Sequence, residues 1–144
     1  MTIAAVLSSK GREVATIRKD ARLGEAATEL TRRKIGALVV VDEAGGIAGV
    51  LSERDIVTCL AEHGDSDLLD RPVAEAMTAP AITVLPTDMV LSALALMTAR
   101  RIRHLPVLQG GRLAGLVSIG DLVKFRIEHI EREAEAMRSY IQSA

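Results

Sequence analysis

Two short segments of the chain carry a serine and an aspartate at the same spacing. Residues 49–55 read G-V-L-S-E-R-D and residues 115–121 read G-L-V-S-I-G-D, so both fit the pattern G-h-h-S-x-x-D, where h is apolar. In each segment the serine follows an apolar run and opens a predicted helix, so its hydroxyl can cap backbone N–H groups there. The candidate side chains are Ser52, Asp55, Ser118 and Asp121.

This arrangement has both a structural and a binding interpretation. An aspartate three residues after a capping serine completes a variant of the capping box, which stabilises a helix by about 1 kcal/mol. The N-terminus of a helix also offers free N–H groups and the positive end of a dipole, which suit a phosphate. A carboxylate beside it can accept hydrogen bonds from both hydroxyls of a ribose. Because the motif occurs twice, we expect it to bind a ligand in at least one copy.

Both motifs belong to a longer internal repeat. Thr16 aligns with Thr83 at an offset of 67 residues, and Gly45 aligns with Gly111 at an offset of 66, because the second copy has a shorter turn. A copy of about 60 residues is marginally stable alone, so the two copies are expected to pack against each other. Such a pseudo-twofold arrangement creates two related clefts, which indicates a binding module.

Hydrophobic periodicity predicts the order β-α-β-β-α in each copy. Asp20 is expected to cap the first long helix, and an apolar run rich in valine is typical of a buried strand. For the first copy we expect an extended piece at 15–17, a helix over 21–34, strands over 35–41 and 47–51, and a helix over 52–61. For the second copy we expect an extended piece at 83–85, a helix over 88–100, strands over 102–108 and 113–117, and a helix after 118.

The last predicted helix is unusually long, since residues 121–142 contain neither Gly nor Pro. Five apolar positions in it follow at spacings of 3, 4, 3 and 4, as in a coiled-coil seam: Ile127, Ile130, Ala134, Met137 and Ile141. This stripe packs either on its own domain or on a second subunit, and we expect a homodimer. The expected division is 1–61 for the first repeat with a short N-terminal helix, 62–76 for a linker, 77–125 for the second repeat and 126–144 for the C-terminal helix.

Composition argues against several classes of partner. The chain has 144 residues, 49% of them hydrophobic, a net charge of −1 and only two aromatic side chains. It therefore lacks the aromatic platform and the basic surface that nucleic-acid binding favours. No apolar stretch approaches the roughly 18 residues of a membrane span, and no signal peptide is evident. We expect a soluble cytoplasmic protein in which the single cysteine, Cys59, is buried.

The residue patterns offer little for catalysis. Neither a P-loop nor a G-x-G-x-x-G segment occurs, and no Ser/His/Asp set lies outside the two motifs. Asp65 and Asp67 have no third ligand at a useful spacing, so we expect no metal site. We therefore expect no enzymatic activity and no catalytic cofactor.

The two motifs are accompanied by the strands I-G-A-L-V-V-V and I-R-H-L-P-V-L and by Met77-Thr78 before the second copy. Over residues 9–125 this set resembles the CBS-domain family, in the stand-alone bacterial form whose tandem repeats make a Bateman module. The resemblance implies an α/β (α+β) fold of two pseudo-twofold-related repeats packed sheet to sheet. It also implies a regulatory module that senses an adenosine ligand, such as AMP, ADP, ATP, NAD or S-adenosylmethionine, and acts on an unidentified protein. The alternative is a structural or partner-binding protein with vestigial pockets.

The resemblance implies a role for each motif residue. Asp55 or Asp121 would bind the ribose, and the matching serine would lie by the phosphate. Thr16 and Thr83 would line the base pocket, unless each threonine simply favours an extended backbone. Arg54, inside the first motif, would supply a cation to either cleft, unless it is an exposed helix arginine.

The resemblance also makes the two clefts different. Arg103 and His104 would face phosphates with a fixed cation and a pH-dependent donor, unless they are a surface charge and a packed ring. The first copy has Gly36 and Ala37 at the matching positions, where small residues leave room for a ring. We therefore expect nucleotide binding to depend mainly on the second motif.

The strand that begins with these basic residues continues with Leu105 and Pro106. Pro106 has no N–H group, so we expect it to interrupt strand pairing. Nearby backbone groups would then be free to meet the edge of an adenine ring.

Overall fold

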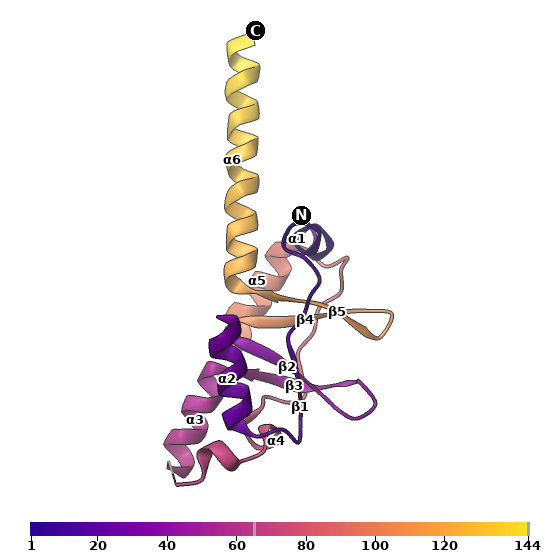
Figure 1. The fold of residues 1–144 in the computed structure, drawn as a ribbon. Helices are drawn as coiled ribbons and strands as arrows, with labels where there is room; N and C mark the ends of the chain where they lie inside the picture. The colour runs from indigo at the N-terminus through magenta and orange to yellow at the C-terminus, as the bar shows by residue number, and fades with distance from the viewer. Residues whose placement is uncertain (65, 144) are drawn as a thin grey trace.

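The computed structural model describes residues 1–64 and 66–143 and contains two repeats stacked on each other (Figure 1). The first repeat consists of β1 (Thr16–Arg18), α2 (Leu23–Arg33), β2 (Ala37–Val41), β3 (Ile47–Ser52) and α3 (Glu53–His63). Its sheet has the order β1-β2-β3, with β1 parallel and β3 antiparallel to β2. The first four residues of β2 are fully buried, as the valine-rich run predicts. Asp65 lies outside the described residues.

The second repeat has the same order with a reduced first strand. It contains α5 (Val90–Arg100), β4 (His104–Gln109), β5 (Arg112–Ser118) and α6 (Ile119–Ser143). In place of a first strand, Val84 makes a single parallel bridge to Val107. The sheet of β4 and β5 is stacked on the sheet of the first repeat (Figure 1). The predicted fold class and the duplicated arrangement are therefore confirmed.

The N-terminal helix α1 (Ile3–Lys10) packs on the second repeat, although it precedes the first. Ile3, Val6 and Leu7 are buried in the core of the second repeat. The Leu7 side chain packs against β5 at Gly115. This close contact requires a glycine, because a Cβ atom on Gly115 would lie 2.6 Å from the Leu7 side chain. This docking carries the C-terminal end of α1 to the second motif.

The segment between the repeats folds back on the first repeat through η1 (Leu68–Asp70) and α4 (Val73–Ala76). It also corrects one prediction, since Asp20 does not cap α2. That helix begins at Leu23 without a side-chain cap. The Leu23 N–H instead donates to the Arg71 carbonyl at 2.9 Å, so a distant backbone group replaces the expected local one.

Helix α6 begins in the second repeat and then projects away from the rest of the chain (Figure 1). Leu122 is its only fully buried residue among those described. The predicted seam is exposed beyond this point, with Ile127, Ile130, Met137 and Ile141 between 46% and 67% exposed. In the described ranges, no helix combines the length and apolarity that crossing a membrane requires.

Candidate functional site

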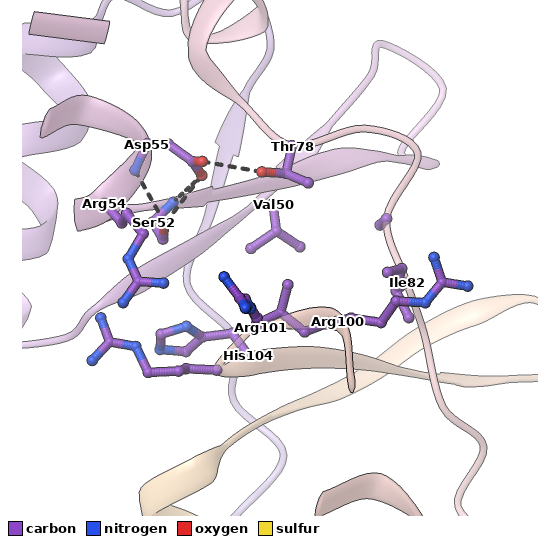
Figure 2. A pocket seen from close by; sticks show the side chains of 12 residues that line it. Val50, Ser52, Arg54, Asp55, Thr78, Ile82, Arg100, Arg101 and His104 are labelled. Carbon is purple, nitrogen blue, oxygen red and sulfur yellow. Dashed lines mark hydrogen bonds between the residues drawn. The ribbon is translucent and has the colours of Figure 1, made fainter. Parts of the chain in front are cut away.

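The first motif opens into a cavity of about 310 Å³ between the repeats, which we call the Asp55 cleft (Figure 2). Ligand pockets typically begin near this size, at roughly 300 Å³. The first repeat contributes residues from β3 and the start of α3, and the second contributes the end of α5 and the start of β4. The lining residues are Val50, Ser52, Arg54, Asp55, Thr78, Ala81, Ile82 and the five residues from Arg100 to His104.

The second motif opens into a larger hollow of about 700 Å³, which we call the Asp121 cleft. Here the first repeat contributes the end of α2 and the start of β2. The segment before β1 and the last residue of α1 complete the lining. The lining residues are Lys10, Glu13, Val14, Ala15, the six residues from Arg32 to Ala37, His104, Leu116, Ser118 and Asp121.

Each motif therefore shares a cleft with the residues at the start of β2 or β4 of the other repeat. Arg103 joins Asp55, whereas Gly36 and Ala37 join Asp121, and His104 borders both clefts. The sequence alone suggests a different grouping, with Arg103 and the second motif in one cleft. Alignment of the repeats shows which positions correspond, but it does not show which side of the interface a side chain faces.

Asp55 combines capping with exposure to the cavity. The Asp55 N–H donates to Ser52 Oγ at 3.3 Å, and the Ser52 N–H donates to Asp55 Oδ2 at 2.8 Å, which makes a capping box for α3. The other carboxylate oxygen, Oδ1, accepts only the Thr78 hydroxyl among the described residues, at 3.0 Å. A neutral hydroxyl is an exchangeable partner, so Asp55 can accept a ribose hydroxyl without losing the cap.

Asp121 has the same capping bonds but a charged third partner. Its backbone N–H donates to Ser118 Oγ at 3.1 Å, and the Ser118 N–H donates to its Oδ2 at 2.8 Å. Lys10 Nζ lies 2.6 Å from the same oxygen. Burial alone would raise the pKa of Asp121, but the hydrogen bonds from Lys10 and Ser118 outweigh it and hold the pKa below its ordinary value.

Lys10 bonds in the second cleft the counterparts of the two groups that Thr78 bonds in the first, namely a strand carbonyl and the motif aspartate. Lys10 does so at Asp121 Oδ2, the oxygen that also caps α6, whereas Thr78 bonds Asp55 Oδ1. Thr78 bonds the Val50 carbonyl through its N–H at 2.9 Å and Asp55 through its hydroxyl. Lys10 donates to the Leu116 carbonyl, which corresponds to Val50, at 2.7 Å, and to Asp121. No local pattern around Lys10 indicates this role, because it depends on α1 docking against the second repeat.

The prediction that Pro106 interrupts strand pairing is wrong. Strand β4 runs through it, and Pro106 pairs with Leu116 of β5. The carbonyl of Pro106 accepts from the Val84 N–H at 3.0 Å, so the side of Pro106 that lacks a donor faces away from β5. Leu105 and Pro106 are both buried and line neither cleft.

The missing donor still leaves one backbone acceptor free on a residue that lines the Asp55 cleft. In the first repeat the Val39 N–H donates to the Ala15 carbonyl at 3.1 Å. The corresponding residues of the second repeat are Pro106 and Ile82, so the Ile82 carbonyl receives no N–H from the described part of the chain. Ile82 lines the cavity at the end opposite His104 (Figure 2).

Thr16 and Thr83 line neither cleft. Thr16 is exposed on β1, where the next residue, Ile17, is buried. The residues just before each threonine line the cavities instead, namely Ala15 in the Asp121 cleft and Ile82 in the Asp55 cleft. The alignment of the two threonines therefore identifies the segments that line the cavities. Side chains alternate between the two faces of an extended segment, so the residue before each threonine lines the cavity and the threonine does not.

His104 is a half-buried, neutral ring at the boundary between the two clefts. Burial lowers its pKa below the ordinary value, and the nearby charge of Arg103 lowers it further, against the opposing effect of Asp121 and Glu53. The ring lies against Gly36, where a Cβ atom would be 3.2 Å from His104 Nε2. The space beside Gly36 is therefore filled by the chain's own His104 ring.

The lowered pKa of His104 predicts a loss of stability in mild acid. The unfolded chain binds a proton near pH 6.5, while the folded chain binds it only at lower pH. The contribution of neutral His104 to the free energy of unfolding is therefore complete above about pH 6.5. It is lost as the pH falls through the pKa that His104 has in the folded chain. Urea unfolding at pH 7.5 and 5.5 should show a smaller pH effect in His104→Gln than in the native protein. The exposed His63→Gln variant is the control, and an equal pH effect in all three proteins would contradict the prediction.

Known proteins resemble this chain in sequence and in structure over most of its length. The family model for the CBS domain matches residues 8–62 and 73–128. A mitochondrial CBS domain-containing protein of Arabidopsis thaliana is 36% identical over 98% of this chain and 72% of its own length. A crystal structure of a CBS-domain containing protein from Agrobacterium tumefaciens is 41% identical, with a TM-score of 0.83 over 87% of this chain and 92% of that one. A CBS domain protein from Pyrobaculum aerophilum, solved in complex with AMP, is 32% identical, with a TM-score of 0.74 over 84% and 89%.

Proposed function

The chain belongs to the CBS-domain family, and from this premise we propose that it is a regulatory module that binds an adenine nucleotide in the Asp55 cleft. The observation that carries the proposal is that one cavity holds a ribose acceptor, basic groups and a free backbone carbonyl. These groups are Asp55, Arg103 with His104, and Ile82. The AMP complex of the Pyrobaculum aerophilum relative supports this ligand class.

The proposed nucleotide lies along the cavity with its phosphate toward His104 and its base toward Ile82 (Figure 2). The ribose hydroxyls replace the Thr78 hydroxyl on Asp55. The phosphate meets Arg103, His104 and the N-terminus of α3, where the positive end of the helix dipole favours an anion. The adenine amino group donates to the Ile82 carbonyl, and the ring packs against the apolar side chains of Ile82 and Val50.

Binding is measured directly by thermal unfolding with added AMP and by titration calorimetry. A ligand at one hundred times its dissociation constant stabilises a protein by about 2.7 kcal/mol. GMP is the matched control, because its base carries a carbonyl where adenine carries the amino group and would leave the Ile82 carbonyl without a donor. If AMP, ADP, ATP, NAD and S-adenosylmethionine all fail to bind, the alternative of vestigial pockets in a partner-binding protein is favoured.

The Asp121 cleft is proposed to remain closed to a ribose in the native chain, because the Lys10 side chain, ion-paired with Asp121 Oδ2, competes with the ribose for this carboxylate. Replacement of Lys10 by methionine is expected to raise the calorimetric stoichiometry from one AMP per chain to two. Lys19→Met, which removes an exposed lysine far from the cleft, should leave one. Two sites in the native protein, or one site in Lys10→Met, would contradict this assignment.

A homodimer is proposed through the exposed seam of α6. An apolar stripe of this size on a monomer is an association liability, and its spacing fits a second helix. Light scattering should give twice the 15.4 kDa chain mass for the native protein, and the mass of one chain for Ile130→Glu combined with Met137→Glu. Glu131→Gln, outside the seam, is the control.

A truncation after Lys124 tests the same interface without introducing charge. A monomeric native chain would refute the dimer. A truncated chain that dimerises equally well at low concentration would refute the contribution of α6. We propose that the regulated protein responds to the nucleotide through this assembly, since a ligand between the repeats can favour one arrangement of them over another.

A further inference from the structure

The Asp55 cleft holds more cationic groups than a single phosphate can use. Four arginines line it, namely Arg54, Arg100, Arg101 and Arg103, and Asp55 is the only acidic residue among the lining residues. None of the four arginines forms an ion pair with a carboxylate of the residues described. Like charges gathered without counter-charges repel one another, so the cleft is electrostatically matched to an anion that is not part of the chain.

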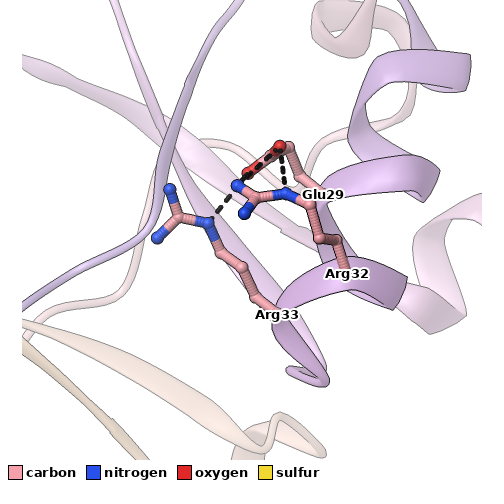
Figure 3. Close-up of polar contacts among 3 residues, drawn as sticks. All are labelled: Glu29, Arg32 and Arg33. Carbon is pink, nitrogen blue, oxygen red and sulfur yellow. Dashed lines mark hydrogen bonds and ion pairs between the residues drawn. The ribbon is translucent and has the colours of Figure 1, made fainter.

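The Asp121 cleft provides an internal comparison, because three of its four Lys and Arg side chains are paired with a carboxylate and only Lys34, among the described residues, is not. Arg32 and Arg33 both bond Glu29, with the shortest distances at 2.9 and 2.8 Å (Figure 3). Lys10 is paired with Asp121 at 2.6 Å. The positions that correspond to Arg54 and Arg103 are glycines, Gly120 and Gly36. Within the described part of the chain, the Asp55 cleft therefore has four unpaired arginines beside one acidic residue, whereas the Asp121 cleft has one unpaired lysine beside two acidic residues, Glu13 and Asp121.

Arg101 occupies a backbone conformation that favours glycine. It ends α5 in the left-handed region, with φ 55° and ψ 41°, and Lys34 ends α2 in the same way, with φ 54° and ψ 47°. Glycine is the usual residue at such a helix end, and other residues there are strained. At both cleft mouths a long basic side chain thus occupies a site where glycine would be more stable, which is typical of functional positions.

Resting on the proposed function, we infer that the Asp55 cleft selects adenine ligands with two or more linked phosphates, as in a nucleoside diphosphate, a triphosphate or a pyrophosphate-linked dinucleotide. A terminal phosphate has three oxygens, while each arginine offers five N–H donors. Arg54 and Arg101 lie near His104, whereas Arg100 extends toward Ile82 (Figure 2). Arg103 and His104 suffice for the first phosphate, and Arg54 and Arg101 are left to bind the second. A sulfonium ligand such as S-adenosylmethionine is disfavoured by the same charges.

Titration calorimetry of the native protein with AMP, ADP and S-adenosylmethionine tests the inference. We expect ADP to bind at least about tenfold more tightly than AMP, because hydrogen bonds to charged groups are the strong ones, and S-adenosylmethionine to bind most weakly. The advantage of ADP over AMP should shrink in added salt. If ADP binds more tightly than AMP, the affinities for ATP and NAD then separate recognition of a terminal phosphate chain from recognition of a bridging pyrophosphate.

Arg101→Gly and Lys34→Gly form a matched pair of variants. Each replaces a strained basic residue by the residue that its backbone favours, so both are expected to unfold at the same temperature as the native protein or higher. Arg101→Gly should reduce the advantage of ADP over AMP by about tenfold, while Lys34→Gly leaves it unchanged. Arg54→Gln should act in the same direction as Arg101→Gly.

The possible failures are distinguishable. Equal affinity for AMP and ADP in the native protein would overturn the inference and leave the proposed function intact. An equal effect of Arg101→Gly and Lys34→Gly would also overturn it, because the charge would then act without regard to the cleft. Failure of AMP, ADP, ATP, NAD and S-adenosylmethionine alike to bind would overturn the proposed function and this inference with it.

Discussion

Replacing Asp55 by alanine is expected to lower the affinity for AMP by about tenfold or more, because ribose hydroxyls buried without their acceptor cost on the order of 1–3 kcal/mol. The expectation rests on the Oδ1 atom of Asp55, whose only partner among the described residues is the exchangeable Thr78 hydroxyl. Titration calorimetry on the folded variant measures the change.

Asp121→Ala is the matched control for this variant. Each aspartate belongs to a serine–aspartate cap of the same geometry, so each substitution removes a comparable helix cap. Asp55→Ala removes the acceptor of the proposed ribose site, whereas the Asp121 carboxylate is already ion-paired with Lys10 through Oδ2. We therefore expect Asp121→Ala to lower stability but leave AMP affinity nearly unchanged. Loss of AMP binding in Asp121→Ala but not in Asp55→Ala would contradict the assignment of the nucleotide to the Asp55 cleft and would make the second motif the main site.

Exchanging Arg103 and His104 for Gly and Ala, the residues of the first repeat at these positions, should weaken AMP binding by between about tenfold and a hundredfold. The two substitutions remove the phosphate donors of the Asp55 cleft and leave Asp55 and Ile82 in place. Adenosine has the same base and ribose but no phosphate, so its affinity should change little.

The comparison of AMP with adenosine also guards against a general loss of structure. His104 packs against Gly36 across the repeat interface, so the exchange can loosen that contact. A loosened interface would weaken both ligands, whereas loss of phosphate recognition weakens only AMP. Equal losses for the two ligands would contradict the phosphate role of Arg103 and His104.

The sequence by itself determined the features that depend on neighbouring residues. The duplicated β-α-β-β-α order follows from hydrophobic periodicity. The caps at Ser52 and Ser118 follow from a serine and an aspartate three residues apart, which is the spacing of one helical turn. The resemblance that these motifs carry implies Asp55 and Asp121 as the candidate ribose acceptors.

Only the tertiary structure decided how these groups combine into sites. Asp55 meets Arg103 across the repeat interface, although the sequence grouped Arg103 with the second motif. Lys10 reaches Asp121 across 111 positions of the chain because α1 docks on the second repeat. Pro106 leaves the Ile82 carbonyl without a donor but does not interrupt the pairing of β4 with β5. The geometry of the strand decides which neighbouring segment the missing N–H would have faced. Propensity and spacing act within a few residues, whereas the direction of a side chain across an interface depends on how whole elements pack.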